Sequence, residues 1–190
     1  MIVRDLEPAE YEAAASLLAA SFSDDAGVLA VVRHDKQVAT WFRAVLPLLA
    51  AAPGRLLGAL EGDALRGVLV GGDTSGPGVG RQISWLVRAL AGVGAGPVWR
   101  TIRHDLQRAQ TFPTGGARIV EFVAVDPAQR GGGVGRALFA ASHADGAPHW
   151  LETTRERNLP IFARLGYVET SRREEHGVSY FAMQRPREQR

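Results

Sequence analysis

The 190-residue sequence contains no cysteine, which excludes disulfides, thiolate nucleophiles and cysteine-ligated zinc sites. Its five histidines show no HxxxH or similar pairing, so we expect no metal site. Lysine occurs once, at Lys36, and the formal net charge of +2 is too weak to indicate a nucleic-acid partner. A small polyanionic ligand fits this charge equally well.

Long apolar runs are missing as well, because no stretch approaches the roughly 20 residues that cross a bilayer. The first residues are acidic where a secretory signal would be basic and then apolar. We therefore expect a cytoplasmic protein with no membrane partner. Hydrophobic residues make up 46% of the chain, enough for a sizeable core, and the length predicts a single domain over residues 1–190.

What the sequence does contain is an alternation of strand and helix patterns. In the first half we expect a strand at 2–6, helices at 7–22 and 36–51, a hairpin at 55–72 and a Gly/Pro-rich loop at 71–80. In the second half we expect two helices within 82–106 separated by a break at 91–97, strands at 117–125, 149–154, 167–173 and 178–184, a helix ending near 144, and a short helix at 158–165. This order predicts an α/β fold, a mixed central β-sheet flanked by helices, with a helical insertion at 71–114 before the central strand.

The most informative segment is VAVDPAQRGGGVGRALFAA, residues 123–141, which places four glycines between a strand and a helix. Glycines there allow positive φ and a close approach to the main chain, and the first helical turn leaves its N–H groups unpaired. Such a turn is suited to bind a pyrophosphate. A plain tight connection is the alternative, although one glycine usually suffices for it. The P-loop and GxGxxG patterns both fail, leaving Arg130-x-x-Gly133-x-Gly135.

This pattern resembles the acetyl-coenzyme A motif of the GNAT superfamily of N-acetyltransferases, [QR]xxGx[GA] after a strand. The segment LETTRERNLPIFARLGYVE, residues 151–169, is similar to a later motif of that family: a strand, an asparagine, a short helix and a Gly-aromatic pair. The residues of this segment are most similar to those of the puromycin N-acetyltransferase-like branch. The two motifs cover roughly residues 118–169, and the resemblance implies a GNAT fold with acetyl-CoA as the acetyl donor.

The resemblance also implies which residues contact this cofactor. The backbone of the central strand would pair with the pantetheine arm as if it were another strand, the N–H groups of the turn would hold the pyrophosphate, Asn158 would hydrogen-bond the pantetheine, and Phe162 would lie beside the sulfur. The implied set is Val123, Ala124, Val125, Arg130, Gly131, Gly132, Gly133, Val134, Gly135, Arg136, Asn158 and Phe162. Arg136 has the alternative of being an ordinary exposed helix arginine.

Acyl transfer from a thioester to an amine needs orientation, polarisation of the carbonyl and a route for a proton. Because aliphatic amines are mostly protonated at physiological pH, a base is expected. Glu121 is the first candidate, since it lies four residues before Val125 and hence on the same strand face. Its alternative is an ion pair with a structural arginine such as Arg118. Glu152 is the second candidate, with the same alternative.

Other polar residues carry weaker signals. His143 lies off the apolar stripe of its helix and is expected to face solvent. His104, His149 and His176 have no recognisable partner in the sequence. Phe162 stands where the family commonly has the tyrosine assigned as the acid for the departing thiolate, and phenylalanine cannot donate a proton. Tyr180 is a candidate substitute, whereas Tyr167 matches a buried aromatic.

The sequence thus predicts an N-acetyltransferase that moves acetyl from acetyl-CoA to a primary amine by direct attack in a ternary complex. A thiol-linked acyl-enzyme is excluded by the absence of cysteine. The apolar helices of the insertion indicate a small-molecule acceptor with an apolar body. The alternatives are a peptide or protein N-acetyltransferase, a non-catalytic acyl-CoA sensor, and a vestigial structural domain that binds no cofactor. The oligomeric state stays open, a homodimer included.

Overall fold

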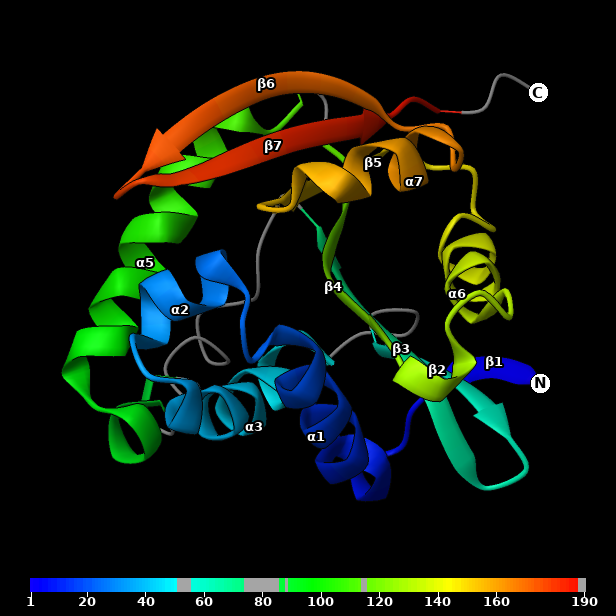
Figure 1. The fold of residues 1–190 in the computed structure, drawn as a ribbon, viewed down its shortest axis with the longest axis horizontal. Helices are drawn as coiled ribbons and strands as arrows, with labels where there is room; N and C mark the ends of the chain where they lie inside the picture. Colours follow the sequence, from blue (N-terminus) through cyan, green and yellow to red (C-terminus); the bar gives the residue numbers. More distant parts are fainter. Residues whose placement is uncertain (51–55, 74–85, 88, 114–115, 188–190) are drawn as a thin grey trace.

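The computed structural model describes residues 1–50, 56–73, 86–87, 89–113 and 116–187. Its centre is one seven-stranded sheet in the order β1-β2-β3-β4-β5-β7-β6 (Figure 1). The strands are β1 (Ile2–Asp5), β2 (Leu56–Glu61), β3 (Ala64–Asp73), β4 (Arg118–Val125), β5 (His149–Thr153), β6 (Val168–Glu175) and β7 (Val178–Arg185). The β4–β5 pair is parallel and the other neighbours are antiparallel, so the predicted mixed α/β sheet is confirmed.

Helices cover both faces of this sheet. The longer ones are α1 (Tyr11–Phe22), α2 (Ala26–Val32), α3 (Val38–Leu49), α5 (Ala95–Arg108) and α6 (Val134–Ser142), and α7 (Leu159–Ala163) is a single short turn. Single 3-10 turns adjoin them at Pro8–Glu10, Asp35–Gln37, Ala109–Thr111, Pro127–Gln129 and Glu156–Asn158. Figure 1 shows α1, α2, α3 and α5 gathered on one side of the strands, with α6 and α7 on the other.

Two apolar clusters follow from this layering. The first cluster joins α1, α2, α3 and α5 to one face of the sheet, with Leu18, Phe42 and Val68 fully buried in it. The second cluster joins α6 and α7 to the opposite face through Leu138, Leu151 and neighbouring side chains. Aromatic rings stiffen the first cluster. There Phe122 of β4 makes edge-to-face contacts with rings from α1 and α3, at centroid distances between 5.1 and 5.7 Å.

Several expected elements differ from the observed ones. Helix α2 was not expected, because its seven residues are too few to show a period. It begins where the Asp25 carboxylate accepts hydrogen bonds from the N–H groups of Gly27 and Val28. Residues 71–73 belong to β3 and not to a loop, since they pair with β4. The rest of that expected loop, and residues 82–85 of the expected helix, lie outside the described residues.

The helical insertion before the central strand is confirmed over its described part. Residues 89–93 and α5 are helical, and the break between them is at Gly94, whose φ of +80° ends one helix before the next begins. Among the described residues no single helix is long and apolar enough to cross a membrane. The pair Pro8–Phe22 and Ala26–Val32 passes that test only when taken together and is bent by 109°.

Candidate functional site

The two central strands separate partway along their length. Pairing between β4 and β5 runs from Arg118 opposite His149 to Val120 opposite Leu151 and then stops. Beyond that point the residues from Phe122 to Val125 pair with β3 alone. One backbone edge of β4 is therefore left without a strand partner, which is the arrangement that an extended ligand needs in order to add itself to a sheet.

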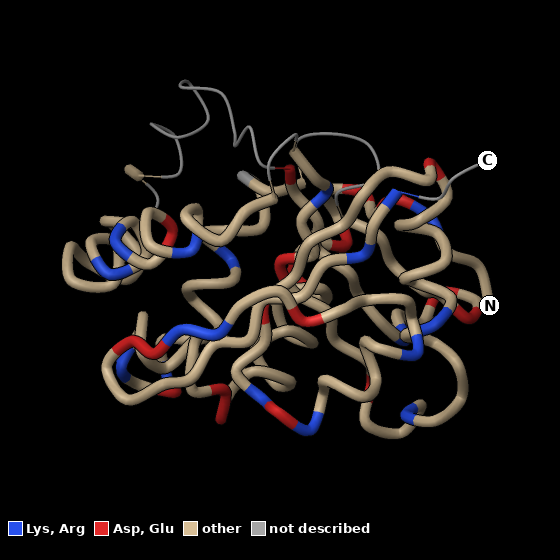
Figure 2. Tube along the Cα trace, turned by 90° about the horizontal axis from the view of Figure 1, so that it is seen from above, with Lys and Arg blue, Asp and Glu red and all other residues tan. Residues whose placement is uncertain are grey.

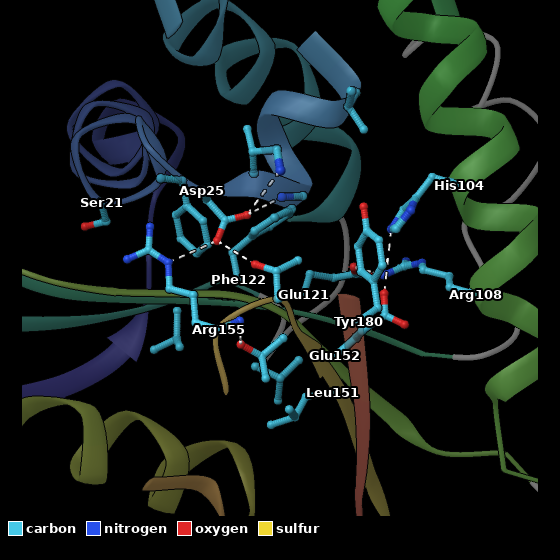
Figure 3. A pocket seen from close by; sticks show the side chains of 18 of the residues that line it. Ser21, Asp25, His104, Arg108, Glu121, Phe122, Leu151, Glu152, Arg155 and Tyr180 are labelled. Carbon is cyan, nitrogen blue, oxygen red and sulfur yellow. Dashed lines mark hydrogen bonds and ion pairs between the residues drawn. The ribbon is translucent and has the colours of Figure 1, made fainter. Parts of the chain in front are cut away.

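A cavity of about 1070 Å³ opens at this split. It is lined from both sides of the sheet: Leu151 and Phe162 belong to the second apolar cluster, whereas Trp41 and Val45 belong to the first. Figure 3 shows Asp25 and Arg155 at one end of the cavity and His104 and Tyr180 at the other. A cavity that passes between two separated strands can hold a long ligand on one side of the sheet and a second molecule on the other.

The glycine turn lies at the N-terminus of α6, directly after β4. Gly131 and Gly133 have φ values of +83° and +85°, and a Cβ on either one would meet no atom within 4 Å. Among the described residues, the N–H groups of Gly131, Gly133, Val134, Gly135 and Arg136 have no hydrogen-bond acceptor. These donors converge at the positive end of a helix next to open space, which is a geometry suited to bind phosphate.

The residues expected to contact the cofactor divide into two groups. Six of them line the cavity, namely Val123, Ala124, Val125, Arg130, Asn158 and Phe162. The others, Gly131, Gly132, Gly133, Val134, Gly135 and Arg136, form the turn and the first residues of α6. The amide nitrogen of Asn158 donates to the Thr153 hydroxyl at 3.3 Å. The arginines of the turn, Arg130 and Arg136, are exposed and have no ion-pair partner in the described chain.

Glu121 lies in the cavity wall, although not on the face that the sequence predicts. Val70 pairs with Phe122 and Gly71 pairs with Val120, so Glu121 is an extra residue, a β-bulge, in β4. The bulge breaks the period of two. Val125 packs into the second apolar cluster, whereas Glu121 faces α5 on the opposite side. The expectation that these two residues share a face is therefore wrong.

The partner of Glu121 is Arg108 of α5, and not Arg118. The Arg108 guanidinium donates to both Glu121 oxygens, at 2.7 and 2.8 Å, and the two side chains are only 16% and 9% exposed. Burial opposes the charge on Arg108, but the neighbouring carboxylates outweigh it and the pKa of Arg108 is raised. Arg118 pairs instead with Asp145 at the surface. The sequence could not identify Arg108, because this contact depends on how α5 packs.

Glu152 of β5 is held in the same manner. Arg173 of β6 donates to its two carboxylate oxygens at 3.1 and 2.9 Å, and Glu152 is 8% exposed. Arg173 also donates to Glu175 at 2.8 Å and lies over the ring of Tyr180, 4.1 Å from its centroid. Both candidate bases thus point toward α5, each with its carboxylate oxygens engaged by one arginine.

The histidines fall into two separate places. His143 does not face solvent as expected. It is half-buried, its Nε2 lies 2.9 Å from the Tyr167 hydroxyl, and burial lowers the pKa of His143 to about 4. His149 lies beside it, fully buried. His104, by contrast, lines the cavity, and its ring packs against that of Tyr180, with the centroids 5.2 Å apart and the planes tilted by 43°.

Of the tyrosines, Tyr180 lines the cavity and Tyr167 does not. Burial, helped by the nearby Glu175, raises the pKa of Tyr180 to about 12, so its hydroxyl stays protonated at neutral pH. Phe162 packs edge-to-face against Phe139 at 5.9 Å and has one side open to the cavity. Among the described residues, no group of three or more His, Asp or Glu side chains is placed to hold a metal ion.

Comparison with known proteins gives the fold. No family model and no curated protein matches the chain. Solved structures do match it: one described as histone acetyltransferase HPA2 and related acetyltransferase from Corynebacterium glutamicum has a TM-score of 0.76 at 19% identity, over 99% of this chain and 97% of that one. Polyamine N-acetyltransferase from Drosophila melanogaster has a TM-score of 0.61 at 15% identity, over 96% and 98% of the two chains.

Arylalkylamine N-acetyltransferase 2 from Aedes aegypti is a further match, with a TM-score of 0.65 at 11% identity over 97% of this chain and 98% of that one. At these identities the likeness establishes architecture. The mixed sheet with its flanking helices has the fold of GNAT acetyltransferases, as the sequence predicts.

Proposed function

We propose that this protein is an acetyl-CoA-dependent N-acetyltransferase whose acceptor is the primary amine of a small molecule. The observation that carries the proposal is the continuity of the site. The glycine turn, with its free N–H groups, lies at the end of the same strand whose open edge borders the cavity. This continuity supports a single path for one long ligand, with its phosphates at the turn and its extended arm along β4. The same cavity has room for a second molecule at the end of that path.

The residues along this path fit coenzyme A. The N–H groups from Gly131 to Arg136 supply donors for a pyrophosphate, and exposed Arg130 adds positive charge. The free edge of β4 at Val123 and Val125 can pair with the amides of the pantetheine arm. Bound acetyl-CoA supplies an activated acetyl group. The protein orients it against the acceptor, excludes water and accepts a proton, and the amine attacks the thioester directly within a ternary complex.

The acceptor side of the cavity indicates an amine with an apolar body. Phe22, Trp41 and Phe122 form a rigid aromatic wall, and Ile102 of α5 contributes to the lining. The matched structures include enzymes described as acting on polyamines, agmatine and arylalkylamines. We infer a small-molecule amine by analogy with them. Membership of the puromycin N-acetyltransferase-like branch rests on the sequence of residues 151–169 and stays a prediction.

A second candidate function is a non-catalytic acyl-CoA sensor. The observation that favours it is Phe162, which occupies the cavity wall without a hydroxyl that could protonate a leaving thiolate. A sensor would bind the cofactor as the enzyme does, but it would not transfer the acetyl group. A peptide or protein N-acetyltransferase would both bind the cofactor and transfer the acetyl group, and would differ only in the acceptor.

The proposal is tested by ligand-induced stabilisation together with transfer. Acetyl-CoA at 100 times its dissociation constant should stabilise the fold by about 2.7 kcal/mol, which a thermal melting curve resolves easily. Acetyl transfer should then be detected as free thiol with a panel of alkylamines, arylalkylamines and peptides. A melting curve that saturating acetyl-CoA leaves unchanged would overturn the proposal. Stabilisation without transfer to any amine would favour the sensor.

Replacement of Phe162 by tyrosine tests how much the missing hydroxyl matters. A thiol with a pKa near 8.5 leaves as a fairly stable thiolate, so help from an acid should be worth little. We expect Phe162→Tyr to raise the single-turnover rate of acetyl transfer by at most roughly tenfold. If the wild-type protein shows no transfer while the tyrosine variant turns over readily, Phe162 marks a lost activity.

A further inference from the structure

His104 is a titratable side chain in the cavity that the proposed function does not yet use. It lies on α5, in the insertion, and points into the acceptor end of the cavity beside Tyr180 (Figure 3). Its side chain is 20% exposed, which leaves it reachable from the cavity. A histidine in that position can exchange a proton with a bound amine.

The two ring nitrogens of His104 have different surroundings. Nδ1 lies 3.3 Å from a carboxylate oxygen of Glu175 and also 3.3 Å from Nη2 of Arg173. Burial opposes ionisation of Glu175, but hydrogen bonds from Arg173 and His104 outweigh it and lower the pKa of Glu175, so this carboxylate is charged at neutral pH. Donation from Arg173 to Nδ1 would place the ring proton on Nε2. Because Nη2 of Arg173 already donates to Glu152 at 2.9 Å, we assign the tautomer in which Nδ1–H donates to the charged Glu175 carboxylate. Nε2 has no hydrogen bond to any described residue, and it lies 3.8 Å from a Glu152 oxygen.

We propose that His104 is the catalytic base of the transfer, accepting the proton of the acceptor amine at Nε2, and that Glu175 is the residue that positions it. The inference rests on the proposed acetyltransferase function. Glu121 and Glu152 are less suited to this role because arginine N–H groups occupy both oxygens of each carboxylate. A proton from the substrate would have to break one of these buried ion pairs.

The charged groups around His104 suit a ring that gains and loses a proton. They come from its own helix and from two strands, and comprise Asp105, Arg108, Glu152, Arg173 and Glu175; the neutral Tyr180 of a third strand lies beside them. The carboxylates of Glu175 and Glu152 lie 3.3 and 3.8 Å from the two ring nitrogens and stabilise the imidazolium that forms. Arg173 opposes it but is itself paired with both of these carboxylates.

The acceptor enters the site as its ammonium form, R–NH3⁺. The ammonium gives one proton to Nε2, and the free amine forms a bond from nitrogen to the thioester carbonyl carbon. The carbon–sulfur bond breaks and coenzyme A leaves as a thiolate. The acylated nitrogen loses a second proton, which ends on that thiolate. His104 then returns its proton to solvent, so the sum is amide, coenzyme A thiol and one proton.

His104→Asn is the central test, with His34→Asn as its matched control, since His34 is exposed and outside the cavity. With the best acceptor found, His104→Asn should lower kcat/KM by about 10²- to 10⁴-fold while stabilisation by acetyl-CoA is kept. The acidic limb of the pH profile should disappear. Glu175→Gln should lower kcat with little change in KM or in stabilisation by acetyl-CoA, because the His104 ring loses the carboxylate that orients it.

A second variant guards against misfolding. His104→Ala leaves space beside the cavity, and added imidazole should restore part of its activity. Suppose that the wild-type protein is active and that His104→Asn keeps both its rate and the acidic limb of its pH profile. That result would overturn the assignment of His104 as the base and would leave the proposed acetyltransferase function standing. A loss of rate that keeps the acidic limb would do the same. A wild-type protein that binds acetyl-CoA but acetylates no amine would overturn the proposed function and, with it, this inference.

Discussion

Gly133→Val should abolish the stabilisation of this protein by coenzyme A. Gly133 has a φ of +85° at the N-cap of α6, and the space beside its Cα is open. A valine there would move the backbone out of this conformation, and its side chain would fill the space where phosphate approaches the N–H groups. Loss of two charge-assisted hydrogen bonds, each worth about 1.5–3 kcal/mol, should raise the dissociation constant by about 100-fold or more.

Gly146→Val is the matched control for the strain itself. Gly146 also has a positive φ, +65°, with nothing within 4 Å of a Cβ, but it lies between α6 and β5, away from the turn. Both variants should lose a similar stability, about 1–3 kcal/mol. Isothermal titration with coenzyme A should then detect binding to Gly146→Val at the affinity of the wild-type protein. Unchanged affinity in folded Gly133→Val would rule out phosphate binding at this turn.

The second large effect concerns the buried pair between α5 and β4. Arg108→Met should destabilise the fold by about 3–5 kcal/mol, because it leaves the Glu121 carboxylate buried without its counter-charge. Replacing both partners, with Arg108→Met and Glu121→Leu together, should restore most of this loss, since the other carboxylate paired with Arg108, that of Asp105, is 53% exposed and can be solvated by water. Urea denaturation of the two single variants and the double variant measures the coupling between the residues.

Arg118→Met is the control for this series. Arg118 pairs with Asp145 at the surface, where the two side chains are 48% and 42% exposed, and its loss should change the free energy of unfolding by less than about 1 kcal/mol. If the double variant is no more stable than Arg108→Met, the stability lost in Arg108→Met does not come from the unpaired Glu121 carboxylate. Restored stability would identify Glu121 as a residue that holds α5 in place.

Much of the geometry of the segment proposed to bind the cofactor could be predicted from the sequence, because its signals are local. The strand, the glycines and the following helix are contiguous, and their backbone geometry depends on residues within a few positions of one another. The same holds for the hairpin at Gly62, which has a φ of +60° between β2 and β3. Figure 2 shows basic and acidic residues interspersed along the trace, as the small net charge indicates.

The acceptor side could not be predicted, because its contacts join residues far apart in the chain. The bulge at Glu121 reversed the face that a strict period of two assigns, and its cause is the pairing with β3. The pairs Arg108–Glu121 and Arg173–Glu152 appear only once α5 and β6 are packed beside the central strands. The apolar pattern of its own helix predicts an exposed His143, but in the structure contact with Tyr167 leaves it half-buried.

The sequence by itself determined the mixed α/β fold and the turn suited to phosphate, since periodicity and glycine placement act over short distances. Only the tertiary structure decided where the strands separate, which arginines neutralise the two glutamates, and that His104 of the insertion faces the cavity. The physical reason is that side-chain charge and burial are set by neighbours brought together in folding. No local pattern in the sequence records which neighbours those are.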